Sequence, residues 1–272
     1  MPHFVKSHGL GNDYIVLEPD KLPFPLTVEN IRLICHRNLG VGSDGILAMA
    51  RPTRGDFAVR IYNPDGSEAE KSGNGTRIFA KYLYDYGHTT QTRFTIDTLG
   101  GLVTAELEVR DGRVTGATMN MGTATIGDLT ELEVDGERIP VITVSVGNPH
   151  CVVLTDDLER VDFYRLGPRI ERHPAFPNRT NVQFARVVAR DEVHIRIWER
   201  GAGETMASGT SASAVAAACR HAGLVDDDVR VVAPGGALRI RIDPGGEIWM
   251  SGPVEEVCAG DFAPEFLRRL GA

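Results

Sequence analysis

Much of this chain consists of short segments in which apolar and polar residues alternate. Segments of this kind lie at 57–62, 93–98, 101–110, 113–121 and 138–146. Alternation with a period of two is typical of β-strands that bury one face. Asp-Gly pairs at 111–112 and 135–136 separate some of the segments, and Asp-Gly favours tight hairpin turns. The pattern therefore predicts a strand-rich protein in which hairpins follow one another.

Helical periodicity is strongest in two segments. The first, 78–83, follows Ser72-Gly73-Asn74-Gly75, and the second, 212–221, follows Ser208 and is rich in alanine. Serine is a favoured N-cap and alanine is the best helix former. We therefore expect one principal helix in each half of the chain.

The remaining segments predict less regular structure. Short helices are expected at 28–36, where Thr27 is a suitable N-cap, and near 262–270, and a loop poor in helix is expected between 155 and 181. The glycine-rich segment 40–45 precedes a strand-like run. A dinucleotide-binding glycine loop follows a strand and opens a helix, so this segment argues against nucleotide binding.

The second half of the sequence repeats features of the first. Adding 136 to a position in the first half leads, at several places and in the same order, to a similar residue in the second. The matching pairs are Gly11-Asn12 and Gly147-Asn148, Arg60-Ile61-Tyr62-Asn63 and Arg196-Ile197-Trp198-Glu199, Glu68 and Glu204, Ser72-Gly73-Asn74 and Ser208-Gly209-Thr210, and Gly87 and Gly223. Because the offset is half of the 272 residues, the series indicates an internal duplication.

The duplication and the strand pattern together predict an α+β fold. We expect two pseudo-symmetric lobes, each a curved, mostly antiparallel sheet or barrel around a central helix. The N-terminal lobe is expected at 1–125, with the C-terminal residues available to complete it, and the C-terminal lobe at 126–272. Clefts between lobes are common sites for small ligands, so the active site is expected there.

Composition excludes several classes of function. The net charge is −8 and the chain has no basic cluster, so nucleic acid is not an expected partner. No run of 18 or more apolar residues occurs, and the N-terminus lacks the apolar core of a signal peptide, so we expect neither membrane association nor export. The four cysteines are scattered and the histidines lack ligand spacing. We therefore expect buried thiols in a cytoplasmic protein, and no metal.

The two duplicated helix starts indicate a particular chemistry. The first turn of a helix presents free backbone N–H groups and a partial positive charge, which suit a carboxylate. The backbones of Gly73, Asn74, Gly209 and Thr210 are therefore candidates for binding an amino-acid substrate, with Ser72 and Ser208 on either side of its α-carbon. That arrangement suits proton removal from one face and delivery to the other, as in a racemase or epimerase. The alternative is that both serines are ordinary helix caps.

Several motifs resemble those of the diaminopimelate epimerase family. Members of this family are cofactor-independent amino-acid epimerases, and they belong to the superfamily that includes proline racemase. The motifs span essentially the whole chain: His8-Gly9-Leu10-Gly11-Asn12-Asp13, Gly40-Val41-Gly42-Ser43-Asp44, Asn63-Pro64-Asp65-Gly66-Ser67-Glu68, Gly73-Asn74-Gly75, Gly147-Asn148-Pro149-His150, Asn181, Glu199-Arg200-Gly201-Ala202-Gly203-Glu204-Thr205 and Gly209-Thr210. The resemblance implies two similar lobes with the site between them and no cofactor. Family members often dimerise, so it also allows a homodimer.

The chain departs from this family at the positions that matter most for catalysis. The resemblance implies a thiol and a thiolate at positions 72 and 208, and both are serine here. A serine hydroxyl is a far weaker acid than a thiol and needs a neighbouring helper to act as a base. Three explanations stay open: engineered substitution, a natural branch with another base or another substrate, and loss of catalysis with binding retained.

The remaining polar motif residues support recognition of an amino acid. The resemblance implies that the distal amino-acid group of the substrate contacts Asn12, Asn63, Asn148, Asn181, Glu199 and Arg200. Arg200 can hold a carboxylate by two hydrogen bonds and Glu199 can accept from an ammonium group. Gly45 stands where some relatives carry glutamine, so one distal contact is expected to be missing.

These observations predict an enzyme of the diaminopimelate epimerase type. It would invert LL- to meso-diaminopimelate without pyridoxal phosphate, in lysine and peptidoglycan biosynthesis, by two opposed acid/base residues. Two alternatives remain. One is a family member that acts on another amino acid or carboxylic acid, as a racemase, dehydratase or allylic isomerase. The other is a catalytically silent amino-acid-binding protein.

Overall fold

The computed structural model describes residues 3–272, which form two compact units. Unit 1 contains the chain up to Met119 together with Pro253–Ala272, and unit 2 contains Asn120–Gly252. The C-terminal segment therefore returns to the first unit. Helices and strands are combined throughout, and the predicted α+β fold is confirmed.

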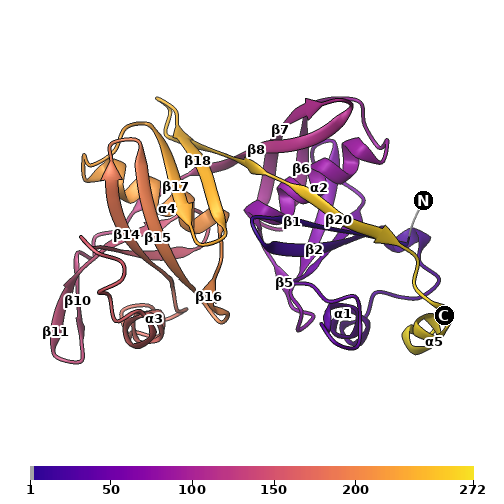
Figure 1. Cartoon of the computed structure of the whole chain (residues 1–272), viewed down its shortest axis with the longest axis horizontal. Helices are drawn as coiled ribbons and strands as arrows, with labels where there is room; N and C mark the ends of the chain where they lie inside the picture. Colours follow the sequence, from indigo (N-terminus) through magenta and orange to yellow (C-terminus); the bar gives the residue numbers. More distant parts are fainter. Residues whose placement is uncertain (1–2) are drawn as a thin grey trace. The chain divides into compact units, whose positions relative to one another are not determined.

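The elements of unit 1 are these (Figure 1): β1 Phe4–Gly9, β2 Asn12–Leu17, a 3₁₀ turn Pro19–Lys21, α1 Val28–Cys35, β3 Ile46–Ala50, β4 Phe57–Tyr62, β5 Glu68–Ala69, α2 Gly73–Asp85, β6 Arg93–Thr98, β7 Gly101–Arg110, β8 Arg113–Thr123, which runs into unit 2, β20 Glu255–Gly260 and α5 Pro264–Leu270.

The elements of unit 2 follow in chain order: β9 Thr125–Ile126, β10 Glu131–Val134, β11 Glu137–Pro140, β12 Ile142–Ser145, β13 Pro149–Leu154, α3 Phe163–Glu171, β14 Asn181–Ala189, β15 Glu192–Glu199, β16 Gly203–Thr205, α4 Gly209–His221, β17 Asp228–Ala233, β18 Gly236–Ile242 and β19 Glu247–Pro253, whose last residue belongs to unit 1.

The two units share one strand order. Unit 1 runs β20-β1-β2-β3-β4-β6-β7-β8, and only the β2–β3 and β4–β6 pairs within this described series are parallel. Unit 2 runs β9-β12-β13-β14-β15-β17-β18-β19, with parallel pairs at the corresponding places, β13–β14 and β15–β17. The repeat seen in the sequence therefore extends to the order and direction of the strands.

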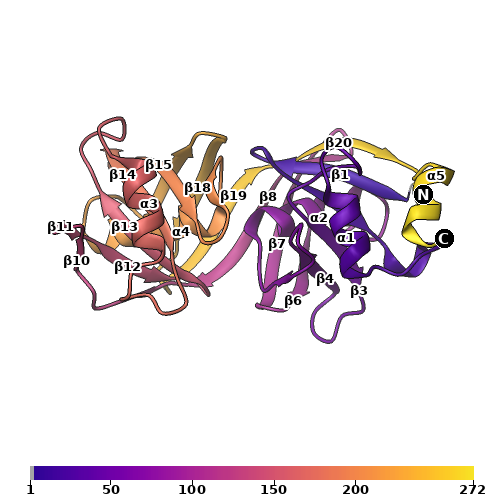
Figure 2. The same cartoon turned by 90° about the horizontal axis from the view of Figure 1, so that it is seen from below.

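Each unit has one buried helix. Eleven of the thirteen residues of α2 are buried, and ten of the thirteen of α4. α2 packs against β1, β2, β4 and β7, and α4 against β12, β13, β14 and β18; Figure 2 shows each helix lying among the strands of its own unit. A helix buried on nearly all sides is a core element, so its N-terminus is held firmly by the sheet around it.

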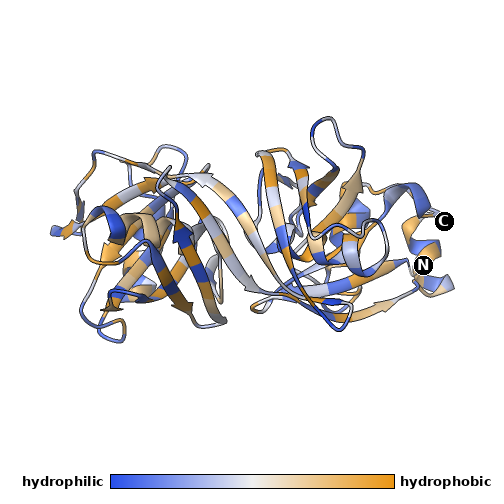
Figure 3. Cartoon of the chain, turned by 90° about the horizontal axis from the view of Figure 1, so that it is seen from above, coloured by the Kyte–Doolittle hydropathy of each residue, from blue (hydrophilic) through white to orange (hydrophobic). Residues whose placement is uncertain are grey.

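The strands supply the apolar cores. Orange and blue bands alternate along many of them in Figure 3, as a half-buried sheet requires. One core in unit 1 includes Ile15, Ile31, Ile46 and Phe262, and one in unit 2 includes Phe163 and Phe184, with Trp198 packed against it. Phe262 stacks on Phe4 with ring centroids 5.1 Å apart, so the C-terminal segment helps to fill the core of the first unit.

The prediction of a loop poor in helix between 155 and 181 is wrong, because α3 lies within this segment. Gly167 and Pro168 interrupt the helical pattern there and hide the helix at the sequence level. Gly167 is needed for packing: a Cβ at this position would lie 2.9 Å from the indole of Trp198. The duplication could have located this helix, because adding 136 to the residue numbers of α1 gives positions within α3.

The expectation of buried thiols holds for three of the four cysteines. Cys35, Cys151 and Cys219 are buried, whereas Cys258 on β20 is exposed, and all four are free. No helix among residues 3–272 combines the length and the apolar character that crossing a bilayer requires.

Candidate active site

Ser72 is the N-cap of α2. Its backbone is extended (φ −137°, ψ 118°), and its Oγ accepts a hydrogen bond from the backbone N–H of Gly75 at 3.0 Å. This bond satisfies one of the donors that every helix leaves open in its first turn. The side chain of residue 72 is thereby held at the positive end of the helix dipole.

Ser208 occupies the same place on α4. Its backbone is nearly the same (φ −147°, ψ 125°), and its Oγ lies 3.5 Å from the backbone nitrogen of Ser211 and 3.4 Å from Oγ1 of Thr210. Ser208 is 8% exposed. The two serines therefore have matching positions, each at the start of a thirteen-residue helix.

A tyrosine that the sequence did not single out contacts Ser72. The hydroxyl of Tyr14, on β2, lies 3.1 Å from Oγ of Ser72 and shares a hydrogen bond with it. Tyr14 is 8% exposed. Local sequence patterns do not reveal this contact, because it joins residues that are 58 positions apart.

Asn12 and Asn74 belong to one chain of hydrogen bonds in unit 1. Nη2 of Arg77 donates to Oδ1 of Asn74 at 2.6 Å, Nδ2 of Asn74 donates to Oδ1 of Asn12 at 3.2 Å, and Nδ2 of Asn12 donates to Oδ2 of Asp44 at 3.1 Å. A guanidinium only donates and an ionised carboxylate only accepts. The two ends of the chain therefore set the orientation of both carboxamides.

Arg77 is a buried cation in the second turn of α2. It is fully buried, and the loss of water around the guanidinium lowers its pKa to about 10. Burial also lowers the pKa of Lys71, which directly precedes Ser72. These two cations add to the positive end of the helix dipole, so this end of α2 favours an anionic ligand.

Asn63 has a turn-forming role in the described contacts. Its side chain donates to Oγ of Ser67 at 2.9 Å, and its backbone N–H donates to the carbonyl of Ser67 at 2.8 Å. The residue is exposed. It therefore closes the turn between β4 and β5 while part of its side chain stays accessible.

Asn148 in unit 2 is oriented by a buried histidine. Nε2 of His150 lies 2.9 Å from Oδ1 of Asn148, and Nε2 of Gln183 lies 3.0 Å from Nδ1 of His150. Because the Gln183 amide donates, Nδ1 accepts and Nε2 carries the proton that His150 donates to Asn148. Nδ2 of Asn148 then faces Oγ1 of Thr210, 3.5 Å away.

His150 is held in its neutral form. It is fully buried, and the loss of hydration lowers its pKa to about 3. The Gln183 amide also donates to Oγ of Ser211 at 3.0 Å. This network ties the loop before β13 to the first turn of α4, and the sequence had left both His150 and Gln183 without a role.

Asn181 supports the segment that carries Glu199 and Arg200. Its Oδ1 accepts from the backbone N–H of Arg200 at 3.0 Å, and its Nδ2 donates to the carbonyl of Pro149 at 3.0 Å. Arg200 is exposed, and its Nη1 donates to the carbonyl of Asn178 at 3.2 Å. Glu199 is partly buried at the end of β15. Asn181 thus joins the first residue of β13 to the turn after β15.

The missed helix α3 supplies a second support for this turn. Glu171, at its C-terminal end, is 2% exposed and accepts from Nε1 of Trp198 at 3.2 Å and from the backbone N–H of Gly201 at 3.0 Å. Its carboxylate therefore binds one residue directly before and one directly after the Glu199-Arg200 pair. The duplication was the signal that could have located it.

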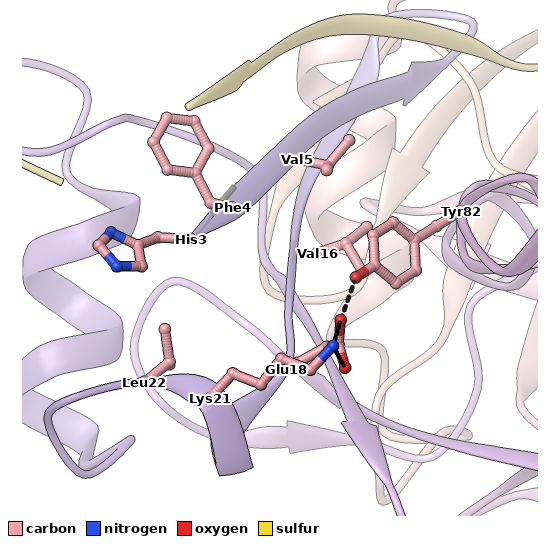
Figure 4. Close-up of a pocket in the computed structure, with 8 residues that line it drawn as sticks. All are labelled: His3, Phe4, Val5, Val16, Glu18, Lys21, Leu22 and Tyr82. Atoms are coloured by element: carbon pink, nitrogen blue, oxygen red, sulfur yellow. Dashed lines mark hydrogen bonds and ion pairs between the residues drawn. The ribbon is translucent and has the colours of Figure 1, made fainter. Parts of the chain in front are cut away.

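Unit 1 also contains a pocket of about 190 Å³, which is lined by other residues than those described above (Figure 4). Phe4, Val16 and Leu22 form part of its wall. The Glu18 carboxylate accepts from the Tyr82 hydroxyl at 2.7 Å and from Nζ of Lys21 at 2.8 Å. None of its lining residues is one of the candidate site residues, and the side chains of Glu18, Lys21 and Tyr82 are already engaged with one another.

The described contacts thus fall into two sets, one in each unit. In unit 1, Ser72 contacts Tyr14, and a separate hydrogen bond joins Asn74 to Asn12. In unit 2, Thr210 lies between Ser208 and Asn148 and contacts both. Among residues 3–272, no group of three or more histidine, cysteine or acidic side chains is placed to hold a metal ion. A hydroxyl at a helix start, where backbone N–H groups are free, is suited to holding a carboxylate and moving a proton.

Comparison with known proteins relates the chain to one family. A family model described as diaminopimelate epimerase matches residues 4–127 and 142–257. Diaminopimelate epimerase 2 of Nostoc sp. is 46% identical over 96% of this chain and 96% of its own length. Diaminopimelate epimerase of Methanothermobacter thermautotrophicus is 44% identical over 89% of this chain and 91% of its own length.

Solved structures show the same fold at lower identity. The crystal structure of a probable proline racemase from Agrobacterium radiobacter superposes with a TM-score of 0.75 and 19% identity, covering 97% of this chain and 93% of the other. At this identity the similarity concerns the fold.

Proposed function

Because this chain belongs to the diaminopimelate epimerase family, we propose that it is an isomerase that inverts the α-carbon of an amino acid. The proposed reaction converts LL- to meso-diaminopimelate, a step of lysine and peptidoglycan biosynthesis. The similarity to relatives of that name extends over nearly the whole chain, which supports the assignment.

One observation carries the proposal. Two helices of thirteen residues, α2 and α4, begin 136 positions apart, and each begins at a serine with an extended backbone whose Oγ faces the first turn. A reaction that exchanges a proton on two faces of one carbon needs two such groups. The duplication supplies one at the start of each helix.

The proposed roles follow from these positions. Ser72 and Ser208 act as general acid and base on opposite faces of the α-carbon, in the cleft expected between the lobes at 1–125 and 126–272. Backbone N–H groups at both helix starts hold the α-carboxylate, without a metal or pyridoxal phosphate. These groups belong to Gly73, Asn74, Gly209 and Thr210, and the distal amino-acid group contacts Asn12, Asn63, Asn148, Asn181, Glu199 and Arg200.

We propose a homodimer in the cytoplasm as the setting of this reaction. The free state of all four cysteines supports a reducing compartment. The homodimer is taken from the family resemblance, and sedimentation of the purified protein tests it.

A second candidate is a reaction that needs one base, such as allylic isomerisation or dehydration of a carboxylic acid. The unequal surroundings of the two serines favour it: Ser72 contacts the Tyr14 phenol, whereas Ser208 contacts the hydroxyl of Thr210. Product analysis with unsaturated diacids and hydroxyproline-like substrates separates the two candidates.

Exchange of the substrate α-hydrogen with deuterium from the solvent tests the proposed reaction. LL- and meso-diaminopimelate are incubated in D₂O with the unchanged protein and with the Ser72→Cys/Ser208→Cys variant. We expect exchange with both, and faster exchange with the thiols, which ionise far more readily. If neither protein exchanges label, the assigned reaction is wrong, and tight binding by calorimetry would then identify a silent binding protein.

A further inference from the structure

The serine at position 72 needs a partner if it is to act as a base. An alkyl hydroxyl is seldom ionised near neutral pH, and enzymes that use serine activate it through an adjacent titratable group. The partner must lie within hydrogen-bond distance of Oγ.

The side chain in that place is Tyr14. Its hydroxyl is 3.1 Å from Oγ of Ser72, and Oγ also accepts from the backbone N–H of Gly75 at 3.0 Å. A phenol loses its proton far more easily than an alkyl hydroxyl, and an unperturbed tyrosine has a pKa of about 10. The backbone N–H would meanwhile stabilise negative charge that develops on Oγ.

Gly45 makes room for the tyrosine ring. A Cβ at this position would lie 2.7 Å from Cε1 of Tyr14 and 2.5 Å from the carbonyl oxygen of Tyr62. β2 and β3 run parallel here, and the backbone N–H of Ile15 donates to the carbonyl of Gly45 at 3.1 Å. Because the backbone fixes this approach, any larger residue at position 45 must displace the ring. The glycine that removes one expected distal contact therefore allows the phenol to reach Ser72.

We propose that Tyr14 is a further acid–base residue of the reaction proposed above, and that its phenol passes a proton to and from Ser72 while Ser72 exchanges one with the substrate α-carbon. The inference rests on the proposed function. In proton removal, Oγ of Ser72 takes the α-proton, the electron pair of the C–H bond stays on carbon, and the former hydroxyl proton of Ser72 moves to the Tyr14 phenolate. Proton delivery is the reverse, and leaves Tyr14 as phenolate.

Unit 2 has no equivalent of this contact among the described interactions of Ser208. Tyr14 shifted by 136 is His150, but His150 donates to Asn148, and its burial keeps the ring neutral. Oγ of Ser208 faces Thr210 and the backbone of Ser211. The two faces of the substrate would thus meet groups of unequal strength, with the stronger at position 72.

The first test does not depend on enzyme activity. In the Ser72→Cys protein, alkylation of the introduced thiol by iodoacetamide is followed against pH by peptide mass spectrometry. Because a phenol donor stabilises the thiolate, adding Tyr14→Phe is expected to raise the midpoint by about one pH unit. Tyr82→Phe is the matched control, since Tyr82 is also a buried tyrosine of unit 1 but donates to Glu18. An unchanged midpoint in the Tyr14→Phe background overturns the inference.

The second test measures α-deuterium exchange with meso-diaminopimelate. Tyr14→Phe is expected to lower the rate by about 100-fold, the usual effect of losing a general acid or base, while Tyr82→Phe stays within twofold. The rate of the unchanged protein should rise with pH between 7 and 9, and Tyr14→Phe should remove this rise. If the exchange rate of Tyr14→Phe is within twofold of the rate of the unchanged protein, the inference is overturned and the proposed function stays intact. No exchange by the unchanged protein contradicts the proposed function and, with it, the role of Tyr14 in that reaction.

Discussion

Asn74 donates a hydrogen bond from Nδ2 to Oδ1 of Asn12 at 3.2 Å, and this bond joins the start of α2 to the start of β2. Arg77 and Asp44 form the two ends of this chain of hydrogen bonds: Arg77 donates to Asn74, and Asp44 accepts from Asn12. The carboxamide that the family resemblance assigns to the substrate is therefore oriented before any ligand arrives. Pre-oriented groups bind with a smaller loss of side-chain freedom.

Asn74→Asp should disturb this orientation while keeping the contact with Arg77. A carboxylate cannot donate to Oδ1 of Asn12, and rotation of the Asn12 amide would turn its oxygen towards Asp44. Loss of one hydrogen bond of about 1 kcal/mol predicts an affinity for diaminopimelate about fivefold weaker. Calorimetry measures it, and urea unfolding shows whether the fold is kept. Unchanged affinity would show that Asn74 does not set the orientation of Asn12.

Gly45→Ala should destabilise unit 1. The added methyl would lie 2.5 Å from a backbone oxygen of Tyr62, which cannot move aside as a flexible side chain can. Overpacking of this kind costs about 1–3 kcal/mol in the free energy of unfolding. Gly260→Ala is the matched control, because its Cβ would meet the Phe4 ring at an ordinary 3.5 Å. Urea unfolding of both variants tests this, and equal stabilities would contradict it.

The stability of the fold should decrease as the pH falls below about 6.5. Burial lowers the pKa of His150 from 6.5 to about 3. Between these values the unfolded chain binds a proton that the folded protein does not. The contribution of His150 is therefore complete above 6.5 and falls with decreasing pH, by up to about 1.4 kcal/mol per unit. Burial lowers the pKa of His88 as well, which adds to the same trend.

Replacing the imidazole isolates this effect. His150→Gln should reduce the difference in the free energy of unfolding between pH 7.0 and 5.5, whatever its effect on stability at either pH. The exposed His221 provides the comparison variant, His221→Gln. If His150→Gln leaves the pH dependence of the free energy of unfolding unchanged, the His150 ring takes up a proton in the folded protein.

One of the four cysteines should react in the folded protein. Cys258 is exposed, and Cys35, Cys151 and Cys219 are buried. Burial also raises the pKa of Cys151 and Cys219 to about 12, so few thiolates form there near neutral pH. We expect iodoacetamide to label one thiol at pH 8 and all four in urea. Rapid labelling of a second thiol in native protein would show that the fold opens there.

Most of the regular structure could be predicted from local patterns. Thr27, Ser72 and Ser208 are N-caps as expected, and each accepts a hydrogen bond from the first turn of its helix, since capping depends on neighbours within a few residues. α3 was missed for an equally local reason, because Gly167 and Pro168 disfavour a helix in isolation. Packing of Gly167 against Trp198 outweighs that preference in the folded chain.

The partners of the site residues could not be predicted in this way. Tyr14 and His150 stand two residues after Asn12 and Asn148, at equivalent points of the duplication, yet one contacts Ser72 and the other contacts Asn148. Periodicity, caps and the repeat follow from residues close together in the sequence, so the order of residues is enough to find them. Which side chain meets which depends on how distant strands and helices pack, and that choice arises only when the chain has folded.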